Sequence, residues 1–457
     1  LSLQKAAEMM NGRIINGQPS SIFTGYQMDS RLISSGDLFF AVIADRDGHK
    51  FIPDAAKNRA QGAVVSRNIT PPRKDFAIIR VKDTVRALQE LAHKIRTRFK
   101  GKVACITGSI GKTTTKYFTA RLLSHRYSVL QSEGNFNNHL GLPLTLLRLS
   151  PEHDIALLEM AMSAQGEIAD LTLVADPDIA VITNIHPVHL EFFNSIDDIA
   201  LAKKEILDTM DPGGTAVLNA DDPLIQKISQ DWKGQSIRFG LSTDCDISAE
   251  NIRKDSRSGI RCRLRYLDKN KDILLPFVYD SYLYNFLAAA AVAFSLDIRL
   301  EDIVETVRFL EPLPDRGRLF HLKNGIRLID DSYNSSPAAL ESALKSLPMQ
   351  NKARKVAILG DMLELGPDEK DFHFAAGTQV QETGWDVLVT VGPLGQYIKD
   401  GAIKSGMGED RIFSFKTSDE AGAHIRDILR KRDLVLVKGS RGIRTEKIVK
   451  SIKKDGF

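Results

Sequence analysis

The sequence predicts an α/β protein in which three successive domains each contain a largely parallel sheet. At 457 residues the chain has the length of about three ordinary domains. From residue 102 onward, short apolar runs such as "KVACITG", "DIALLEM" and "KVAILGD" alternate with helical patterns, which is typical of parallel sheets. The two prolines of "EPLPDRGR" at 311–318 interrupt this alternation and indicate a linker between two such units.

The elements follow in three segments. Residues 1–98 are mixed and end in the helical pattern "TVRALQELAHKIRTRF". Residues 99–312 hold the first buried strands, and around 235–280 the alternating "GIRCRLRYL", the turn-like "DKNKD" and "ILLPFVY" predict an antiparallel hairpin with Cys262 facing inward. Residues 313–457 contain "GIRLIDDSY", "KVAILGD", "DVLVTVG" and "DLVLVKGS", which predict a second doubly wound domain.

Composition excludes several functional classes. The 62 basic and 58 acidic residues leave a net charge of +4, which gives no reason to expect nucleic acid or a membrane as partner. No apolar run approaches the roughly 20 residues of a bilayer span, so we expect no stable membrane insertion. Cys105, Cys245 and Cys262 form no C-x-x-C pair, so neither a disulfide nor a zinc site is expected, and a reducing cytoplasm is the expected location.

The stretch "VACITGSIGKTTTKYF" at 103–118 predicts a phosphate-binding loop, although it departs from the common G-x-x-x-x-G-K-[ST] pattern at Ile106. Gly108 and Gly111 let the backbone approach a phosphate, Lys112 can reach its oxygens, and Thr113 can hold Mg²⁺. The helix that starts near Lys112 adds unpaired N–H groups and a positive dipole end. The alternative is a glycine turn beside an exposed lysine; we favour an ATP site because the loop directly follows a buried strand.

Acidic and imidazole groups follow the next strands. Glu159 ends "DIALLE", while His186 and His189 follow "DIAVITN". Lys203 lies on a predicted helix in line with isoleucines, which indicates its inner face. Each residue alone has a structural explanation, but the carboxyl ends of neighbouring parallel strands collect functional groups. A carboxylate and an imidazole near Thr113 predict coordination of one or two Mg²⁺ ions.

A third group of polar residues follows the linker. Arg316, Arg318, Asp330, Asp331 and Asn334 lie in "DRGRLF" and "LIDDSYNSSP", and "GDMLELG" and "VKGSRGIRTEKIV" follow two later strands. Charges of both signs at one sheet edge suit a charged, polar ligand. By spacing alone, ordinary turn chemistry is the better explanation for "SYNSSP".

Taken together, these motifs resemble those of the Mur ligases of peptidoglycan synthesis. The resemblance rests on "TGSIGKTTT", "GNFNNHLGLPLTLL", "LEMAMSAQGEI", "TNIHPVHLE…AKKEIL", "VLNADDP", "GDMLELG" and "KGSRGIR", in this order and over essentially the whole chain. The family's loop is the shorter G-x-x-G-K-T form, which explains Ile106. The resemblance implies a UDP-substrate-binding α/β domain at 1–98, a central P-loop ATPase-type sheet with an antiparallel addition at 99–312, and a C-terminal Rossmann-like domain for the incoming dipeptide at 313–457.

The resemblance also implies a reaction. Within the family the chain is most similar to the member that adds D-Ala-D-Ala to UDP-MurNAc-tripeptide with ATP and Mg²⁺, through an acyl phosphate. The N-terminal "DSRLISSGDLFFAVIADRDGHKF" carries the likeness to that member, and the absence of a D-N-P-R motif separates the chain from the member that adds a diamino acid. We expect a cytoplasmic monomer whose partners are these small molecules.

Residue roles are carried over from the family by matching motifs. The residues expected to hold the nucleotide are Gly108, Ser109, Gly111, Lys112, Thr113, Thr114, Asn137, Asn138, Asn285, Arg318 and Asp331. Catalysis is expected from Lys112, Glu159, His189 and Lys203, and metal binding from Thr113, Glu159, His189 and a carbamylated Lys203. The residues expected to contact the two substrates are Asp29, Ser30, Arg31, Asn334, Ser335, Lys438, Ser440 and Arg441.

One segment departs from the family's pattern. Relatives carry "GxHNxxN" before the position of Asn285, whereas this chain has "YDSYLYN", with Ser281 and Tyr282 in place of the His-Asn pair. Adenine would then be held differently, with Tyr282 as the candidate stacking surface. Two alternatives stay open: a sibling ligase that adds another amino acid, as in folylpolyglutamate synthesis, and a nucleotide-dependent binding protein with decayed catalysis.

Overall fold

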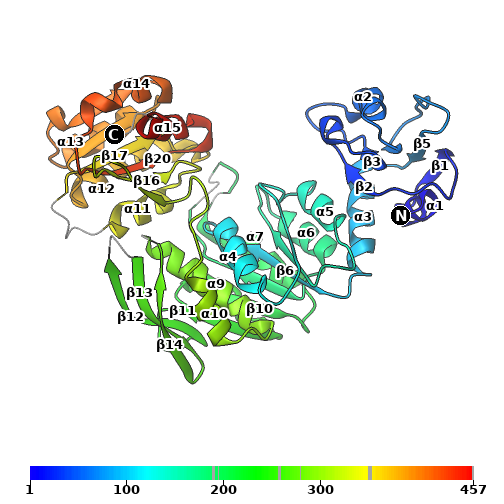
Figure 1. The fold of residues 1–457 in the computed structure, drawn as a ribbon, viewed down its shortest axis with the longest axis horizontal. Coiled ribbons are helices and arrows are strands. Elements are labelled where there is room, and N and C mark those ends of the chain that lie inside the picture. The colour runs from blue at the N-terminus through cyan, green and yellow to red at the C-terminus, as the bar shows by residue number, and fades with distance from the viewer. Residues whose placement is uncertain (188–190, 194, 256–258, 278, 348–352, 455–457) are drawn as a thin grey trace.

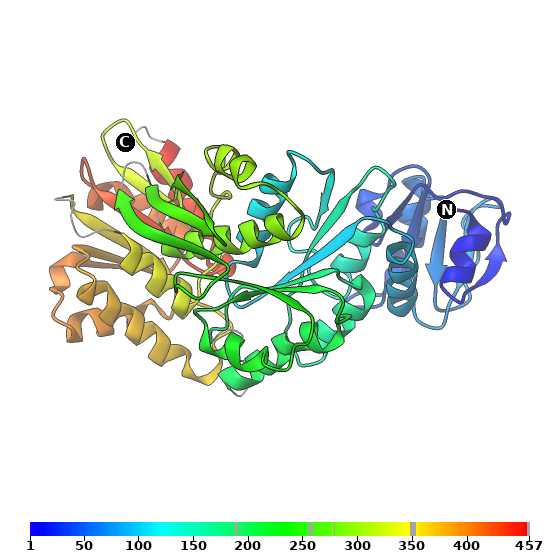
Figure 2. The same cartoon turned by 90° about the horizontal axis from the view of Figure 1, so that it is seen from below.

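Three β-sheets follow one another along the chain in the computed structural model, which describes residues 1–187, 191–193, 195–255, 259–277, 279–347 and 353–454. Figures 1 and 2 show them in a row, with the central sheet between the N-terminal and C-terminal ones. The predicted fold class, α/β with three mainly parallel sheets, is confirmed.

The first sheet has the order β1-β5-β4-β3-β2, and its pairs are parallel except for β1 with β5. Its strands are β1 (Arg13–Asn16), β2 (Gly25–Gln27), β3 (Asp37–Phe40), β4 (Gly62–Val65) and β5 (Ala77–Arg80). The accompanying helices are α1 (Leu3–Met9), α2 (Ile52–Lys57), α3 (Thr84–Arg96) and the short turns η1 (Ser30–Leu32) and η2 (Gly48–Phe51). The predicted helix at 84–99 is therefore present as α3, which leads into the central sheet.

The central sheet has nine strands in the order β14-β13-β12-β11-β10-β9-β6-β8-β7 within the described residues. These are β6 (Lys102–Thr107), β7 (Val129–Gln131), β8 (Ile155–Glu159), β9 (Ile179–Ile182), β10 (Thr215–Asn219), β11 (Gln235–Gly240), β12 (Ile247–Asp255), β13 (Gly259–Tyr266) and β14 (Lys269–Leu275). The pairs from β7 to β12 are parallel, and β13 and β14 are added antiparallel.

The hairpin of β13 and β14 confirms the predicted antiparallel addition, but its turn is not where the sequence placed it. Tyr266 pairs with Lys269, so the turn consists of Leu267 and Asp268, and the rest of "DKNKD" already belongs to β14. Leu267 adopts a positive φ of 52°, which such a tight turn requires. Lys, Asn and Asp suit the start of β14 because it is an exposed edge strand.

Helices cover both faces of the central sheet because alternate residues of β6 point to opposite sides. Ala104 and Ile106 join a hydrophobic core with α4 and α9, whereas Val103 and Cys105 join another with α5, α6 and α7. The helices of this segment are α4 (Lys112–Leu123), α5 (Gly141–Leu146), α6 (Glu167–Ala175), α7 (Ile196–Thr209), α8 (Pro223–Ile228), α9 (Asp280–Ser295) and α10 (Leu300–Val307).

The last sheet has the order β15-β16-β20-β17-β18-β19, with β15 antiparallel and the others parallel. Its strands are β15 (Arg318–His321), β16 (Arg327–Asp331), β17 (Lys355–Gly360), β18 (Val387–Val391), β19 (Ile412–Phe415) and β20 (Leu434–Lys438). Its helices are α11 (Pro337–Ser346), α12 (Glu369–Glu382), α13 (Gly395–Lys404), α14 (Ser418–Ile428) and α15 (Glu446–Lys454), with η3 (Gly366–Asp368), η4 (Glu409–Arg411) and η5 (Arg441–Ile443).

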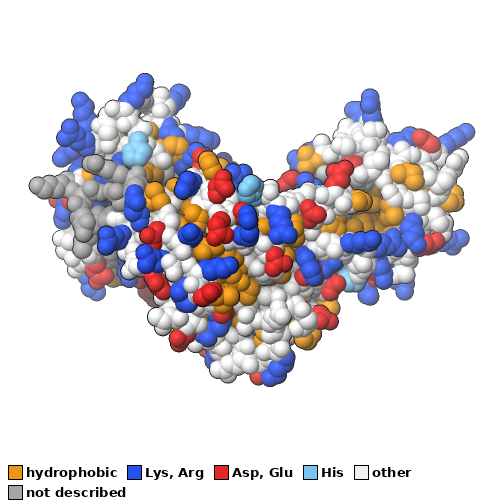
Figure 3. Space-filling model, turned by 60° about the horizontal axis from the view of Figure 1, so that its bottom comes forward, with side chains coloured by type: hydrophobic (Ala, Val, Ile, Leu, Met, Phe, Trp, Pro, Cys, Tyr) orange, Lys and Arg blue, Asp and Glu red, His pale blue; other side chains and the backbone are white. Residues whose placement is uncertain are grey.

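The molecular surface is hollowed between the N-terminal and C-terminal lobes (Figure 3). Basic and acidic side chains are interspersed on this face, and neither sign forms a broad field. No helix in the described ranges combines the length and the apolar character that crossing a membrane requires.

Candidate active site

The predicted phosphate-binding loop lies between β6 and α4, and two of its glycines are required by backbone conformation and by space. Gly108 has a φ of +142° and Gly111 a φ of +87°. A Cβ atom on Gly108 would lie 1.9 Å from Oγ1 of Thr183, and one on Gly111 would lie 2.2 Å from Oδ1 of Asn285. The loop backbone is therefore packed too closely for any side chain at either position.

The residues that directly follow β9 hold this loop in place through hydrogen bonds. The backbone N–H of Ser109 donates to the carbonyl of Asn184 and that of Ile110 donates to the Asn184 side chain, both at 2.9 Å. The Thr183 hydroxyl donates to the Ile110 carbonyl at 2.8 Å. His186 takes part through its backbone, whose N–H donates to Oγ of Ser109 at 2.9 Å. These bonds fix the loop before any ligand binds.

Lys112 and the start of α4 face the loop. The Lys112 Nζ donates to the carbonyls of Gly108 at 2.7 Å and Ser109 at 3.2 Å. Helix α4 begins after Gly111 without a side-chain cap, so its first N–H groups have no capping side chain. Burial lowers the pKa of Lys112, with Glu159 opposing and Arg316 adding to the shift. A glycine cradle, an uncapped helix start and an ammonium group fit the phosphates of ATP.

Glu159 lies beside this loop at the carboxyl end of β8 and is only 3% exposed. The amide of Asn137 donates to its Oε1 at 3.0 Å, and the Lys116 ammonium lies 3.3 Å from its Oε2, which no hydrogen bond satisfies. Burial alone would raise the pKa of Glu159, but Lys116 and Lys112 outweigh burial and lower it. A hydrogen bond from Thr113 also lowers this pKa. Glu159 is therefore an ionised, incompletely satisfied oxygen donor.

Lys203 projects from the inner face of α7, as predicted, and is 3% exposed. Burial lowers its pKa well below the ordinary value, and the nearby Lys112 ammonium lowers it further. The side chain therefore favours a neutral amine. His189, predicted as its companion, lies outside the described residues.

Oxygen donors around the loop fit a hard cation with few protein ligands. Within the described ranges, no three His, Cys, Asp or Glu side chains gather as a metal site. The Glu159 carboxylate and the Thr113 hydroxyl are the donors present, and Mg²⁺ in nucleotide sites commonly keeps waters and phosphate oxygens as its other ligands. The residues therefore fit Mg²⁺ bound together with a nucleotide.

The residues predicted after the linker meet at one edge of the last sheet. The buried Lys438 Nζ lies 2.7 Å from Oδ2 of Asp331 and donates to the Asn334 carbonyl at 3.0 Å. The Ser440 hydroxyl donates to the Ser335 carbonyl at 3.3 Å and accepts from the backbone N–H of Leu363 at 3.0 Å. Burial raises the pKa of Asp331 although Lys438 opposes the shift. Lys438 and Ser440 thus hold the backbone of the "SYNSS" turn.

The linker brings Arg316, rather than Arg318, to the phosphate-binding loop. Nη2 of Arg316 donates to Oγ1 of Thr113 at 3.4 Å. Arg318 instead lies 3.3 Å from the Glu311 carboxylate. The sequence named both arginines as polar residues after the linker, and the family resemblance gave Arg318 a nucleotide role that stays a prediction; Arg316 is the one that contacts the loop here.

Lys116 was also missed, although the sequence carried a signal for it. It follows Lys112 by four residues in "GKTTTK", so both lysines lie on one face of α4. Its Nζ donates to the Ser132 carbonyl at 2.8 Å in addition to its contact with Glu159.

Other predicted nucleotide residues differ in their surroundings. Asn285 on α9 lies against Gly111 and accepts from the Thr115 hydroxyl at 3.4 Å. Thr114 is buried. Oδ1 of Asn138 accepts from the backbone N–H groups of Leu140 and Gly141, so Asn138 stabilises the start of α5 while Asn137 contacts Glu159.

Tyr282 does not provide the stacking surface that the sequence suggested. Its side chain is 5% exposed and packs against Phe118, Phe277 and Tyr279, with ring centroids 5.2 to 6.1 Å away. The hydroxyl donates to the carbonyl of Arg316. A ring enclosed by other aromatic rings is buried most favourably with its hydroxyl paired, which leaves no face for adenine.

The N-terminal residues predicted to contact the UDP-substrate lie together at η1, beside the first sheet. Asp29 lies before η1, its carboxylate 2.6 Å from Nη2 of Arg31, and it accepts from the Arg31 backbone N–H at 3.0 Å. The buried Ser30 accepts through its carbonyl from the Asn58 amide at 2.8 Å.

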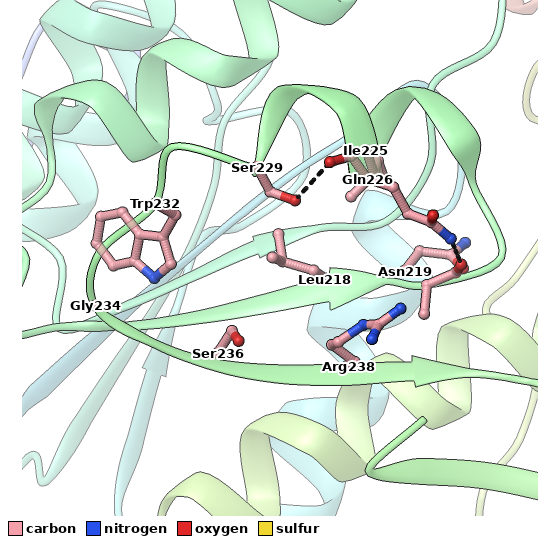
Figure 4. A pocket seen from close by; sticks show the side chains of 10 residues that line it. Leu218, Asn219, Ile225, Gln226, Ser229, Trp232, Gly234, Ser236 and Arg238 are labelled. Carbon is pink, nitrogen blue, oxygen red and sulfur yellow. Dashed lines mark hydrogen bonds between the residues drawn. The ribbon is translucent and has the colours of Figure 1, made fainter. Parts of the chain in front are cut away.

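A cavity of about 200 Å³ lies elsewhere on the central sheet, between β10, β11 and α8. Figure 4 shows Trp232 at one end and Asn219, Gln226 and Arg238 at the other. None of the predicted site residues lines it. It is therefore distinct from the phosphate-binding loop.

Comparison with known proteins gives a consistent result. Residues 106–293 match the Mur ligase middle domain, and residues 316–441 match the Mur ligase glutamate ligase domain. A UDP-N-acetylmuramoyl-tripeptide–D-alanyl-D-alanine ligase from Bacillus subtilis is 33% identical, with 99% of this chain and 98% of the relative covered.

Solved structures agree along nearly the full length. MurF from Acinetobacter baumannii superposes with a TM-score of 0.91 at 30% identity, covering 99% of each chain. MurF ligase from Thermotoga maritima in complex with ADP gives a TM-score of 0.84 at 29% identity, covering 94% of this chain and 97% of that one. The resemblance noted from the motifs is confirmed: this chain belongs to the Mur ligase family, together with its UDP-N-acetylmuramoyl-tripeptide–D-alanyl-D-alanine ligases.

Proposed function

We propose that this chain uses ATP to form an amide bond between the terminal carboxyl group of UDP-N-acetylmuramoyl-tripeptide and the amine of D-alanyl-D-alanine, a step of peptidoglycan precursor synthesis. The observation that carries the proposal is the placement of Lys112 and Thr113 beside the buried Glu159 carboxylate at the end of β8, with Lys203 of α7 near Lys112. The family relationship over 99% of the chain supports the choice of substrates.

The chemistry requires activation of an unreactive acid. A carboxylate does not react with an amine at neutral pH because oxide is not a leaving group. Transfer of the terminal phosphoryl group of ATP to the carboxylate gives an acyl phosphate and ADP; the amine then attacks the carbonyl carbon, and inorganic phosphate leaves. Each species is anionic, so Lys112 and the loop N–H groups stabilise charge as it develops.

The metal and the modified lysine complete the proposed site. Thr113, Glu159, the carbamylated Lys203 and His189 would hold Mg²⁺, which would supply positive charge to offset the phosphates. Carbamylation joins the neutral Lys203 amine to CO₂ with loss of one proton, so a buried neutral amine becomes an anionic oxygen donor. The lowered pKa of Lys203 favours this reaction because it provides the neutral amine.

Each of the three domains is proposed to bind a different substrate. We assign the UDP-substrate to residues 1–98 with Asp29, Ser30 and Arg31, ATP to 99–312, and the dipeptide to 313–457 with Asn334, Ser335, Lys438, Ser440 and Arg441. Closure of the last domain would align the amine and exclude water. We propose a monomer that acts in the cytoplasm, where its nucleotide substrates are.

Phosphate release measured with ATP, D-Ala-D-Ala and UDP-MurNAc-tripeptide, in lysine and diaminopimelate forms, tests the proposal. We expect phosphate release and a pentapeptide product that both depend on the dipeptide. Release with glutamate and a folate substrate instead would support a sibling ligase. Nucleotide binding by the folded protein without turnover of either tripeptide would support the binding-protein alternative.

A further inference from the structure

The peptide at Arg316 is fixed in the linker between α10 and β15. The Tyr282 hydroxyl donates to the Arg316 carbonyl. The next residue, Gly317, has a φ of +63°, and a Cβ atom there would lie 2.6 Å from Cε2 of Tyr279. Both tyrosines belong to the buried aromatic cluster of the central domain, so this cluster holds the linker backbone at Arg316 and Gly317.

The Arg316 guanidinium spans the junction between the central and last domains. On one side it donates to the Thr113 hydroxyl of the phosphate-binding loop at 3.4 Å. On the other side its Cζ lies 4.0 Å from the centroid of the Tyr333 ring, in the turn that follows β16. One linker side chain therefore contacts both the nucleotide loop and the predicted dipeptide-binding edge.

Arg316 forms no ion pair in the part of the chain that the structure describes, and the carboxylate that its charge reaches, that of Asp331, is already paired with Lys438. Arg318 and Lys116 each have a carboxylate partner, Glu311 and Glu159. Arg441 adds a second guanidinium 5.5 Å from the same Tyr333 ring, and Lys112 lies close enough to repel Arg316. Glu159 offsets the charge of Lys112, so the two guanidinium groups of Arg316 and Arg441 are the cations that a bound anion would stabilise here.

We propose that Arg316 is a phosphate-binding residue that recognises the terminal phosphate of bound ATP from the linker. The inference rests on the proposed ATP-dependent function and adds to it a residue that neither the motif reasoning nor the comparisons assign. A guanidinium presents several donors in a fixed planar fork that matches phosphate oxygens. Because Thr113 and Lys112 are the loop residues expected at the distal phosphates, a donor beside Thr113 reaches the same end of the nucleotide.

Nucleotide affinity separates this role from a structural one. Isothermal titration of the full chain with AMP-PNP and with ADP, each with Mg²⁺, compares ligands with and without the terminal phosphate. We expect R316A to weaken AMP-PNP binding by about tenfold or more and ADP binding by less than about twofold. R316K, which keeps the charge but loses the fork, should lie between wild type and R316A for AMP-PNP.

R308A is the matched control, since Arg308 is an exposed arginine just before the same linker and should leave both affinities unchanged. Equal losses for ADP and AMP-PNP in R316A, or no loss for either, would overturn the inference. A wild-type chain that binds neither nucleotide would instead contradict the proposed ATP site. Melting temperatures without nucleotide identify any variant that fails to fold. If R316A fails to fold, the affinities of R316K for AMP-PNP and ADP test the inference instead.

Discussion

Gly111 has a positive φ and is also closely packed, whereas Gly166 has a positive φ but no close neighbour. Both precede a helix with φ near +90°. A Cβ atom on Gly111 would meet Asn285, but a Cβ atom on Gly166 would have nothing within 4 Å. The pair therefore separates conformational strain from steric exclusion.

We expect G166A to destabilise the protein by about 1 kcal/mol through backbone strain alone. G111A should destabilise it more, because the buried Asn285 must also move, and should weaken nucleotide binding at the loop. Melting temperatures would rank wild type above G166A and G166A above G111A, and titration with ADP would measure binding. Equal melting temperatures for the two variants would show that Asn285 yields without strain.

Lys203 should give stability a distinctive dependence on pH. Burial holds its pKa well below the ordinary 10.5, so between the two values the unfolded chain carries a proton that the folded protein lacks. Stability then rises with pH through this window, by up to about 1.4 kcal/mol per pH unit, and the contribution is lost as pH falls through the lowered pKa. Relative to K203M, the wild-type melting temperature should rise from pH 7 to pH 10.

This comparison requires CO₂-free, nucleotide-free buffer, so that Lys203 stays unmodified. Since other groups titrate equally in both proteins, the difference between the two melting curves is the relevant quantity. A difference that stays constant over this pH range would mean that Lys203 is charged in the folded protein.

Sequence predicted the loop residues but not every side chain that meets them. Lys112, Thr113 and Glu159 were predictable because short motifs fix them relative to strand ends. The contact of Arg316 with Thr113 depends on the linker's path, and the environment of Tyr282 depends on rings up to 164 positions away in the chain, such as Phe118. Contacts of this kind have no local pattern in the sequence.

At the scale of elements, the linker before β15 should depend on one hydroxyl. Y282F removes the hydrogen bond to the Arg316 carbonyl while keeping the ring, a loss of about 1 kcal/mol. We expect trypsin to cleave after Arg316 or Arg318 about fivefold faster, because the linker detaches from the aromatic cluster more often. Timed digestion followed by mass spectrometry measures the rate.

Tyr284 on the same helix provides the control. Its hydroxyl donates to Oδ2 of Asp221 at 3.0 Å, away from the linker. Y284F should therefore leave linker cleavage unchanged. If both variants accelerate cleavage equally, general loosening of α9 would explain the result better than the linker bond.

Most strands were predictable, and the misplaced hairpin turn shows where prediction failed. Residues 103–106 of β6 and 155–158 of β8 are uninterrupted apolar runs because both faces of these strands are buried, so composition alone indicates them. The start of β14 is exposed at the sheet edge, and its polar residues are equally common in turns. Register with β13, rather than composition, decides where that strand begins.

At the scale of the whole molecule, Arg96 joins the first domain's last helix to the central sheet. The side chain of this 8% exposed arginine donates to the carbonyls of Ala175 and Asp176 and lies 2.9 Å from Oδ2 of Asp178. Lys102 contacts the same carboxylate at 2.8 Å, but its side chain is 59% exposed. The two cations share a partner and differ in burial.

R96A should therefore lower stability by about 2 to 4 kcal/mol, because it leaves buried carbonyls unpaired. K102A should change stability by less than about 1 kcal/mol, since water solvates the exposed partner. Thermal denaturation of both variants tests the difference. Comparable losses of stability in the two variants would mean that pairing of Asp178 with any cation stabilises the protein, and not the buried contacts of Arg96.

The packing of β6 on both faces limits which residues of this enzyme can be substituted without disturbing the loop. Its alternate residues belong to two separate cores, and its last residue leads directly into Gly108. An altered side chain on either flank would tilt the strand and carry the loop with it. Engineering libraries that aim at new acyl acceptors should therefore spare 103–106 and diversify the turns of the C-terminal lobe.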